Sequence, residues 1–341
     1  MPFSEVNKSE ATKAKELLDI LYIGQYDKYK SLFLEQKITS IDSIDVTMLE
    51  DIGLVEKVDC GFKGTVRIFS YRNKFIITDF PSLLEIDRVF PTDEEGPGYL
   101  IDNLNIKNGD VVLDLGTGSG IFAIFCADKA KKVIATDINP KALDYARFNA
   151  VLNNVENKIE FLCGDLFESI EKERFDFIVS NPPPVPVPPN MPFYIHSDGG
   201  PNGIDVFKRM LERILNYATP DKRMQFIMLS LEKQPNPLII DILKLCLEKA
   251  KVKISLFPLY PQRSPIEPDF LALFEKAENF PKWKTNLKRE GFIWLDCFFI
   301  DIRSDSKFQI IINSRLQNQS SYNWRKRMAK YVLPVYTDKI V

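Results

Sequence analysis

Hydrophobic and polar positions along the chain follow two patterns, and the change lies near residue 110. In the first part, short amphipathic runs at helical spacing precede an alternating run around Arg72-Asn73. The first of these runs has Ser9 as its expected N-cap and Gly24 as its expected stop. Helices are expected over residues 9–24, 26–36 and 46–52, and a β-hairpin over residues 65–78. These elements predict a small α+β domain that covers residues 1–88.

From residue 110 onward, nearly continuous apolar runs alternate with helical segments. Strands of this kind are typical of a parallel sheet that has helices on both faces. The expected strands cover residues 111–115, 132–136, 159–162, 175–179, 224–230, 252–257, 292–302 and 307–313. The expected helices cover residues 119–130, 140–152, 202–217 and 237–250. Residues 89–341 are therefore expected to form an α/β domain with a doubly wound sheet.

The first strand of this sheet ends in a glycine-rich turn. Asp114 stands near the strand end, and Gly116, Gly118 and Gly120 follow in a G-x-G-x-G pattern. Glycines at such a turn let the backbone approach a ligand closely. A dinucleotide fingerprint would place its third glycine one position later, where this chain has Ile121. Because many strand-to-helix turns contain glycines, the turn alone is weak evidence of a binding site.

Acidic residues follow the next two strands. Asp137 stands at the end of the second strand, where a carboxylate can bind both hydroxyls of a ribose. It could also cap the helix that begins near Pro140, although Asn139 suits that role better. Asp165 follows the third strand, where a carboxylate could meet an adenine amino group. Ligands of open α/β sheets bind at the carboxyl ends of the strands, so these features are expected to meet in one site.

The fourth strand ends abruptly in a proline-rich loop, SNPPPVPVPP, which begins at Ser180. Proline fixes the backbone and removes the N–H donor, so this loop presents rigid carbonyl acceptors. Such acceptors suit a substrate that carries N–H donors. A proline run can equally be a linker or a strand terminator. The neighbouring motifs have to decide between these interpretations.

Composition excludes several classes of protein. With 341 residues, 45% hydrophobic and 27% charged, the chain is typical of a soluble protein with a core, and no apolar run is long enough to span a membrane. His196 is the only histidine, which excludes a multi-histidine metal site, and no metal site is expected. The five cysteines are scattered, and the N-terminus shows no secretory signal, so a cytoplasmic protein with reduced thiols is expected.

The motifs DLGTGSG, TDINPKAL, GDLFE and SNPPP, in that order, resemble those of the class I S-adenosylmethionine-dependent methyltransferases. More narrowly, they are similar to the small-domain group with an N-P-P-[YF] motif, which includes release-factor glutamine, ribosomal RNA guanine-N2 and adenine-N6 methyltransferases. The resemblance implies a Rossmann-like sheet, mostly parallel with an antiparallel strand near the C-terminus. It implies S-adenosylmethionine as the cofactor, released as S-adenosylhomocysteine. The implied cofactor-binding residues are Asp114, Gly116, Thr117, Gly118, Gly120, Asp137, Ile138, Asn139, Asp165, Leu166 and Asn181.

The resemblance also assigns roles on the acceptor side. In the family, the asparagine side-chain oxygen and the first proline carbonyl accept both hydrogens of a planar –NH2 group, which implies this catalytic work for Asn181 and Pro182. The sequence departs from the family at Pro184, where the family has an aromatic residue that stacks on the substrate. Phe193 or Tyr194 could supply the missing aromatic face. The implied substrate-binding residues are Pro183, Pro184, Phe193, Tyr194 and His196; for His196, a loop histidine without a catalytic role is the simpler interpretation.

The methyl acceptor is expected to be a macromolecule. DGGPNGID is similar to a segment of the glutamine enzymes, so a protein glutamine is the first candidate. The segment 282–341 has 12 Lys+Arg against 5 Asp+Glu, including Trp324-Arg325-Lys326-Arg327, so an RNA base is the second. Residues 1–88 resemble a winged helix but have 12 Lys+Arg against 15 Asp+Glu, so duplex DNA is not an expected partner. The alternatives are a small-molecule methyltransferase and a catalytically inactive S-adenosylmethionine-binding regulator.

Overall fold

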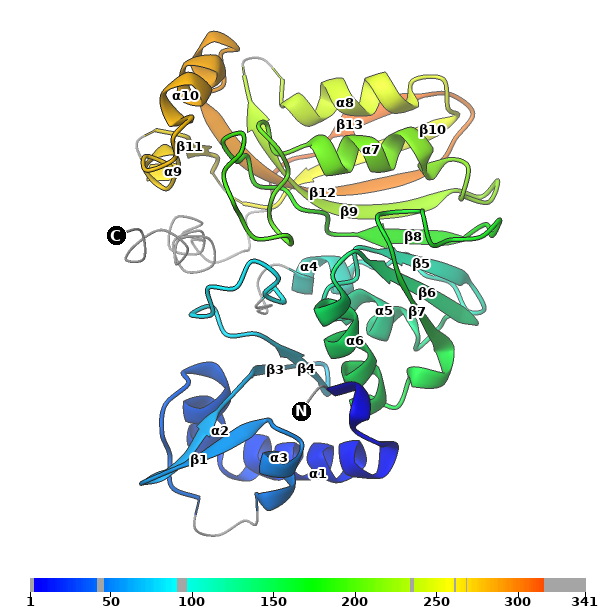
Figure 1. Ribbon diagram of the computed structural model, residues 1–341. Coiled ribbons are helices and arrows are strands. Elements are labelled where there is room, and N and C mark those ends of the chain that lie inside the picture. The colour runs from blue at the N-terminus through cyan, green and yellow to red at the C-terminus, as the bar shows by residue number, and fades with distance from the viewer. Residues whose placement is uncertain are drawn as a thin grey trace.

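The computed structural model describes residues 3–41, 46–90, 97–233, 236–260, 262–267 and 269–315. Its N-terminal part consists of short helices and two hairpins (Figure 1). They are η1 (Phe3–Glu5), α1 (Lys8–Gly24), α2 (Tyr26–Tyr29), η2 (Lys30–Leu34), α3 (Thr47–Asp51), β1 (Val55–Val58), β2 (Gly61–Gly64), β3 (Arg67–Tyr71) and β4 (Lys74–Thr78). These helices and the β3–β4 hairpin confirm the elements expected for the N-terminal part.

The basic cluster at residues 324–327 lies outside the residues that the structure describes.

The N-cap of α1 differs from the prediction. Asn7, not Ser9, caps the helix: its Oδ1 accepts hydrogen bonds from the N–H groups of Ser9 at 2.9 Å and Glu10 at 3.1 Å. The Glu10 carboxylate in turn accepts the Asn7 N–H at 2.9 Å. This reciprocal pair satisfies three backbone donors at the start of the helix, which a serine two residues later cannot do. The helix does end at Gly24, as predicted.

The two hairpins of the N-terminal part depend on different sequence features, and only one of them was predicted. In the β3–β4 hairpin, Arg72 and Asn73 have φ angles of 46° and 61°, which fit the twist that a two-residue turn requires. The β1–β2 hairpin was not predicted, because it has few apolar residues and contains Gly61 and Gly64. A Cβ atom at Gly64 would lie 2.3 Å from the Leu32 carbonyl oxygen, so this glycine is required by a close contact with the helical segment before it.

Most of the remaining strands form one mixed sheet. Within the described residues it has nine strands, in the order β13-β10-β12-β9-β8-β5-β6-β7, with β11 pairing to β12 (Figure 1). Its strands are β5 (Val111–Leu115), β6 (Lys132–Asp137), β7 (Ile159–Cys163), β8 (Phe177–Ser180), β9 (Arg223–Glu232), β10 (Val252–Pro258), β11 (Ser264–Pro265), β12 (Trp294–Ser304) and β13 (Gln309–Ile312). All neighbours from β7 to β9 are parallel, whereas β12 runs antiparallel to β9 and β10. The predicted Rossmann-like sheet with an antiparallel C-terminal strand is confirmed.

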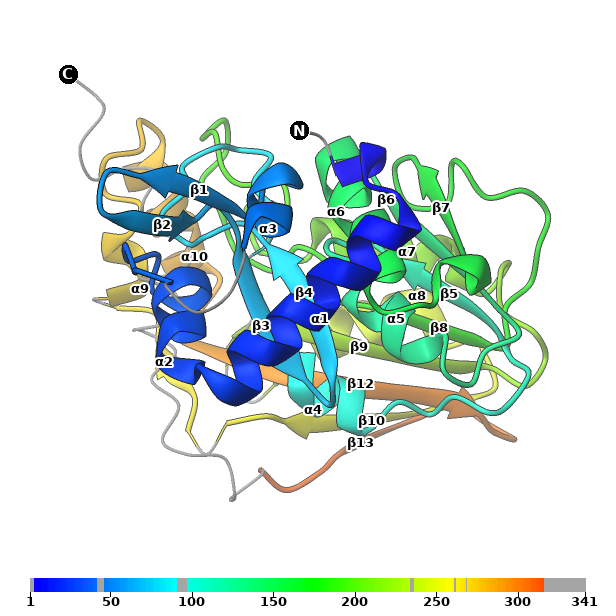
Figure 2. The same ribbon diagram turned by 90° about the horizontal axis from the view of Figure 1, so that it is seen from below.

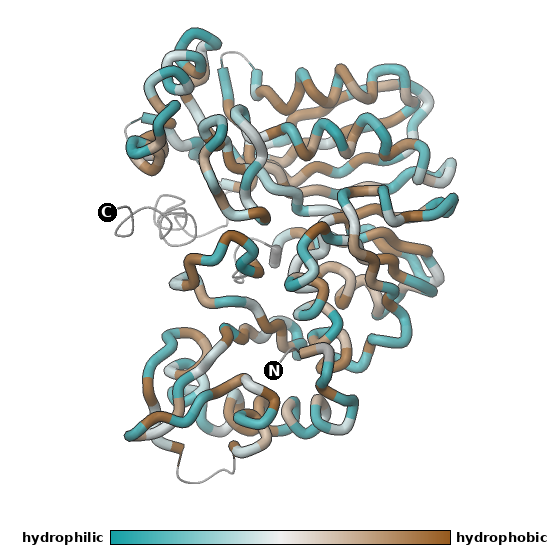
Figure 3. Tube along the Cα trace, viewed as in Figure 1, coloured by the Kyte–Doolittle hydropathy of each residue, from teal (hydrophilic) through white to brown (hydrophobic). Residues whose placement is uncertain are grey.

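Helices cover both faces of this sheet. They are α4 (Pro97–Asp102), α5 (Ile121–Cys126), α6 (Pro140–Leu152), η3 (Glu156–Lys158), α7 (Asp205–Ile214) and α8 (Leu238–Leu247). Alternate residues of β9 point to opposite layers: Phe226 and Met228 pack with α7 and α8, whereas Ile227 packs with α4 and α5. Hydrophobic and hydrophilic residues alternate along α7 and α8, as expected for helices with one buried face (Figure 3).

The N-terminal part packs on α6. Its core includes four α6 residues, Ala142, Tyr145, Phe148 and Leu152. The Phe3 ring stacks on the Phe148 ring with centroids 4.8 Å apart, and α1 lies against α6 (Figure 2). The α6 helix therefore belongs to the core of both parts. The division of the chain at residue 88 into two domains stays a prediction.

A smaller core forms beside the sheet, under the proline-rich loop. It joins Val185, Val187 and Phe193 of the loop to α9 (Asp269–Ala272) and α10 (Phe280–Arg289). The Trp283 indole N–H of α10 donates to the Pro201 carbonyl at 2.8 Å. The helix α10 was not predicted. It packs against the outer side of the loop that follows β8 and holds that loop in place.

Candidate active site

A cavity of about 370 Å³ opens at the carboxyl ends of the central strands. The residues that follow β5, β6, β7 and β8 line it, as do side chains of β9 and β12. The strand order reverses between β5 and β8, so the cavity lies at the switch point of the sheet. Its volume is within the range of small-molecule sites, about 300–1,000 Å³. The four predicted motifs therefore do meet at one edge of the sheet.

The glycine turn after β5 forms one wall. Gly116 and Gly118 have φ angles of 71° and 55°, which favour glycine, and no atom lies within 4 Å of the place where a Cβ would stand. Gly120 is different: a Cβ there would lie 2.9 Å from the Ala146 Cβ, so it allows helix packing and does not line the cavity. The first two glycines leave open space for a ligand along their backbone.

Asp114 supports the turn from beneath. It is fully buried and outside the cavity lining; its Oδ2 accepts hydrogen bonds from Thr117 Oγ1 at 2.6 Å and from the Ala123 N–H at 2.9 Å. Burial raises the pKa of this carboxyl group to about 7, against the lowering effect of the two hydrogen bonds. In the structure, Asp114 joins the β5 end to the turn and to α5.

Asp137 and Asn139 form the second wall, at the end of β6. The Asp137 carboxylate accepts the Gly118 N–H at 2.8 Å and the Asn139 N–H at 2.9 Å, so it joins two of the predicted motifs. Burial raises its pKa. Asn139 caps α6 by accepting the Lys141 N–H at 3.0 Å, which confirms the capping role expected for it. Ile138 lines the cavity and is exposed, which leaves its side chain free to cover a ligand.

Asp165 and Leu166, which follow β7, line the far end of the cavity. The Asp165 carboxylate forms an ion pair with the Arg209 guanidinium of α7, which also lines the cavity. Arg209 was not predicted as a site residue. This ion pair joins α7 to the segment that follows β7, and the sequence of α7 contains no motif that signals the contact.

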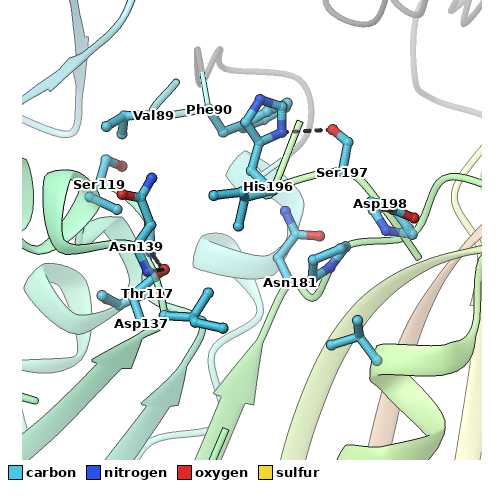
Figure 4. A pocket seen from close by; sticks show the side chains of 18 of the residues that line it. Val89, Phe90, Thr117, Ser119, Asp137, Asn139, Asn181, His196, Ser197 and Asp198 are labelled. Carbon is cyan, nitrogen blue, oxygen red and sulfur yellow. Dashed lines mark hydrogen bonds between the residues drawn. The ribbon is translucent and has the colours of Figure 1, made fainter. Parts of the chain in front are cut away.

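Asn181 follows β8, whose last residue, Ser180, donates a hydrogen bond from its hydroxyl to the Leu115 carbonyl. The Asn181 side chain lines the cavity, and Figure 4 shows it opposite Thr117, Asp137 and Asn139. No residue in the described part of the chain forms a hydrogen bond with its amide group. This amide is therefore available to a ligand.

The proline-rich loop is held by the DGGPNG segment. The Val185 N–H donates to the Ser197 carbonyl at 2.9 Å, the Gly199 N–H to the Val185 carbonyl at 3.0 Å, and the Val187 N–H to the Gly200 carbonyl at 3.0 Å. The two segments therefore lie side by side like short strands. A Cβ at Gly199 or Gly203 would lie under 3 Å from backbone atoms, so these glycines allow the close approach. The segment positions the loop.

The remaining predicted residues divide between the lining and the core. Pro183, Pro184 and His196 line the cavity. Pro182 is buried and lies outside the lining. Phe193 is buried against Phe274 in the core under α9 and α10, and Tyr194 is fully buried, so neither aromatic ring lines the cavity. Both aromatic side chains of this loop are buried in the protein core, and neither is left to contact a substrate.

A segment that the sequence did not single out also lines the cavity. We call residues 79–90 the strap. Its Asp87 carbonyl accepts a hydrogen bond from Asn139 Nδ2 at 2.7 Å, and its Ile86 carbonyl accepts the Ile195 N–H at 3.0 Å. The strap therefore contacts both the β6 end and the proline-rich loop. Lining residues that were not predicted include Arg88, Val89, Phe90, Ile195, Arg209, Ile227, Leu229, Tyr260 and Cys297.

Comparisons with known proteins agree with this arrangement. The family model of the methyltransferase small domain matches residues 87–186. The "Putative protein N5-glutamine methyltransferase" of Methanocaldococcus jannaschii is 39% identical over 138 residues, which are 39% of this chain and 68% of that protein. A "Bifunctional methyltransferase" of Rickettsia prowazekii is 32% identical over 165 residues, 47% of this chain and 26% of that protein. The "Putative ribosomal RNA large subunit methyltransferase" of M. jannaschii is 30% identical over 185 residues, 46% of each chain.

The chain belongs to the methyltransferase small domain family, within the class I S-adenosylmethionine-dependent methyltransferases. The assignment that the four motifs predicted is thereby confirmed, and the protein is a methyltransferase. In the described part of the chain, no helix has the length and apolar character needed to cross a membrane.

Proposed function

We propose that the protein transfers a methyl group from S-adenosylmethionine to a planar nitrogen of a macromolecule, with the side-chain amide of a protein glutamine as the first candidate. The observation that carries this proposal is Asn181. Its amide group lines the cavity at the switch point of the sheet and has no hydrogen-bond partner among the described residues. An unpaired amide beside a ligand cavity is suited to orienting a polar group of the substrate.

Two features of the cavity support S-adenosylmethionine as the cofactor. The open space along Gly116 and Gly118 is a cradle that any side chain would fill. Asp137, Asp165 and Asp198 give the lining more acidic than basic side chains, which suits a cationic ligand. We propose that Gly116, Thr117, Gly118, Asp137, Ile138, Asn139, Asp165 and Leu166 hold S-adenosylmethionine. Asp114 and Gly120 would act indirectly, by shaping the turn.

The chemistry depends on orientation. S-adenosylmethionine, when bound, supplies a methyl group on a positively charged sulfur. A planar amide or aryl nitrogen is a poor nucleophile because its lone pair is delocalised. If Asn181 Oδ1 accepts one hydrogen of the –NH2 group, it directs the nitrogen lone pair toward the methyl carbon. As the nitrogen–carbon bond forms, the carbon–sulfur bond breaks, and the nitrogen loses one proton to solvent. The role of Pro182 as second acceptor is supported by the family resemblance alone.

Charges in the lining favour an amide over a nucleic acid base. Among the described lining residues the basic side chains are Arg88 and Arg209. Arg88 donates to the carbonyls of Pro81 and Leu83, and Arg209 is paired with Asp165, so neither is free for a phosphate. The name of the first relative, a protein N5-glutamine methyltransferase, supports the same acceptor. An RNA base is the second candidate, supported by the similarity to the ribosomal RNA methyltransferase and by the basic C-terminal segment.

We also propose that the protein works in the cytoplasm. Its five cysteines are free thiols, which is in keeping with a reducing compartment.

The test is methyl transfer from methyl-labelled S-adenosylmethionine to fractionated cell extract, with protease and ribonuclease treatment of each labelled fraction. We expect protease-sensitive label, recovered as N5-methylglutamine after digestion. Ribonuclease-sensitive label would favour the RNA candidate, and label in the low-molecular-weight fraction would favour a small metabolite. Cofactor binding without transfer to any fraction would favour an inactive regulator. If titration calorimetry shows no binding of S-adenosylmethionine at all, the proposal fails.

A further inference from the structure

His196 lies in a stack of three side chains beside the cavity. Its ring lies parallel to the Tyr194 ring, with centroids 5.3 Å apart and an interplanar angle of 8°. The Arg88 guanidinium carbon lies 3.8 Å from the centroid of the same Tyr194 ring. Tyr194 is fully buried and lies outside the cavity lining, whereas Arg88, which is also fully buried, and His196, which is partly exposed, both line the cavity. The stack thus joins a ring of the core to two side chains at the cavity, and the imidazole ring is one of its ends.

Two further contacts fix the orientation of this ring. His196 Nδ1 lies 2.6 Å from the Ser197 hydroxyl, and the Phe90 ring meets the imidazole at a centroid distance of 5.1 Å and an angle of 65°. Burial, followed by the charge of Arg88, lowers the pKa of His196 to about 3, so the ring is neutral at physiological pH. A neutral, immobilised ring can act as a flat apolar surface without repelling a cationic cofactor.

The His196 ring and the Asn181 side chain line the same part of the cavity (Figure 4). Figure 4 shows both side chains on one side of the cavity, opposite Thr117, Asp137 and Asn139. That is the side toward the proline-rich loop, where Pro184 leaves the lining without the aromatic residue of the family motif. Phe193 and Tyr194, which the sequence offered as replacements, are buried outside the lining. On this loop, His196 is the residue that brings an aromatic ring to the cavity.

We propose that His196, supported by Tyr194 and Arg88, is the planar wall of the acceptor subsite and takes the place of the aromatic residue that Pro184 lacks. The wall selects acceptors whose –NH2 group belongs to a flat, uncharged system, such as a carboxamide or a heteroaromatic amine, over aliphatic amines. Stacking on the wall and the hydrogen bond to Asn181 together fix the plane of the acceptor. This inference rests on the proposed function, because it assigns one surface of the same site.

Because His196 is the only histidine, its ring signals report on this one place. The experiment uses the full-length protein with isotope-labelled histidine, saturated with S-adenosylhomocysteine, and follows the ring by NMR. Benzamide is the planar carboxamide probe and cyclohexylamine is the aliphatic amine of similar size. We expect a saturable upfield shift of the His196 ring protons with benzamide and none with cyclohexylamine.

Two variants make the test specific. His196→Ala should weaken benzamide binding to the S-adenosylhomocysteine complex about tenfold, as expected when an aromatic stacking partner is lost, whereas His196→Phe should bind it within a few-fold of the wild type. Both variants should bind S-adenosylhomocysteine like the wild type, which shows that they are folded.

The inference is overturned if benzamide leaves the His196 signals unchanged, if cyclohexylamine shifts them equally, or if His196→Ala binds benzamide like the wild type. Failure of the wild-type protein to bind S-adenosylhomocysteine would instead count against the proposed function, and this inference would fall with it.

Discussion

The side-chain amide of Asn149 pairs with the backbone of Ile77 as the backbone of a neighbouring strand would. Its Oδ1 accepts the Ile77 N–H at 2.9 Å, and its Nδ2 donates to the Ile77 carbonyl at 2.9 Å. The same Nδ2 donates to the Ser119 carbonyl in the glycine turn at 2.9 Å. One turn further along α6, Asn153 pairs with Phe75 in the same way. The free edge of β4 is therefore covered by α6, and the N-terminal part is joined to the cavity wall.

From this relationship we predict that Asn149→Ala strongly destabilises the protein. The substitution leaves buried backbone groups of Ile77 and Ser119 without partners, and we expect a loss on the order of 3 kcal/mol in the free energy of unfolding. Chemical denaturation measures it. Asn154→Gly is the matched control, because Asn154 is exposed and has a φ of 58° that suits glycine. Equal stability of the two variants would show that the amide pairing contributes little.

Asp137→Ala should weaken binding of S-adenosylmethionine by roughly 1.5–3 kcal/mol, because it removes the charge-assisted hydrogen bond that we propose to the ligand and the contact that holds Gly118. Titration calorimetry measures the effect, with Asp128→Ala, an exposed carboxylate outside the lining, as the control. NADH should not compete. Tight NADH binding in the absence of a response to S-adenosylmethionine would contradict the assignment of the site.

Asn181→Ala should lower the rate of methyl transfer on the order of 100- to 1,000-fold, because the substitution removes the preorganised transition-state contact that we propose for this side chain. Cofactor affinity should change far less, since the side chain is assigned to the acceptor. The readouts are single-turnover transfer to the acceptor fraction and calorimetry on the same sample. Asn190→Gly, on the exposed part of the same loop, is the control. If Asn181→Ala transfers at the wild-type rate, the asparagine serves the architecture of the loop.

The single histidine should not titrate between pH 5 and 8. Its folded-state pKa of about 3 lies below the ordinary value of 6.5, so the neutral form is favoured by folding. The corresponding stability is fully present above pH 6.5 and is lost as the pH falls toward 3. NMR titration of the ring measures the pKa directly. In His196→Phe, this part of the acid destabilisation should disappear, and an unchanged stability profile from pH 6.5 to 3 would contradict the prediction.

The sequence by itself determined where the central strands lie along the chain and which motif follows each of them. Strands β5, β6, β7 and β8 appear as apolar runs because both faces of a parallel sheet are buried, and glycine, aspartate and asparagine residues follow their ends. Those signals are local, because they depend on residue type and spacing within a few positions. The meeting of the four motifs at one cavity followed from the topology of parallel strands.

Only the tertiary structure decided which residues complete the site. Asp165 meets Arg209, 44 positions along the chain, because the fold brings α7 close to the segment that follows β7. His196 lines the cavity while Tyr194, two residues earlier, is buried, because the strap brings Arg88 over the Tyr194 ring. The DGGPNG segment holds the proline-rich loop through backbone hydrogen bonds. Such contacts depend on distances between segments that are remote in sequence, and neither periodicity nor residue type carries that information.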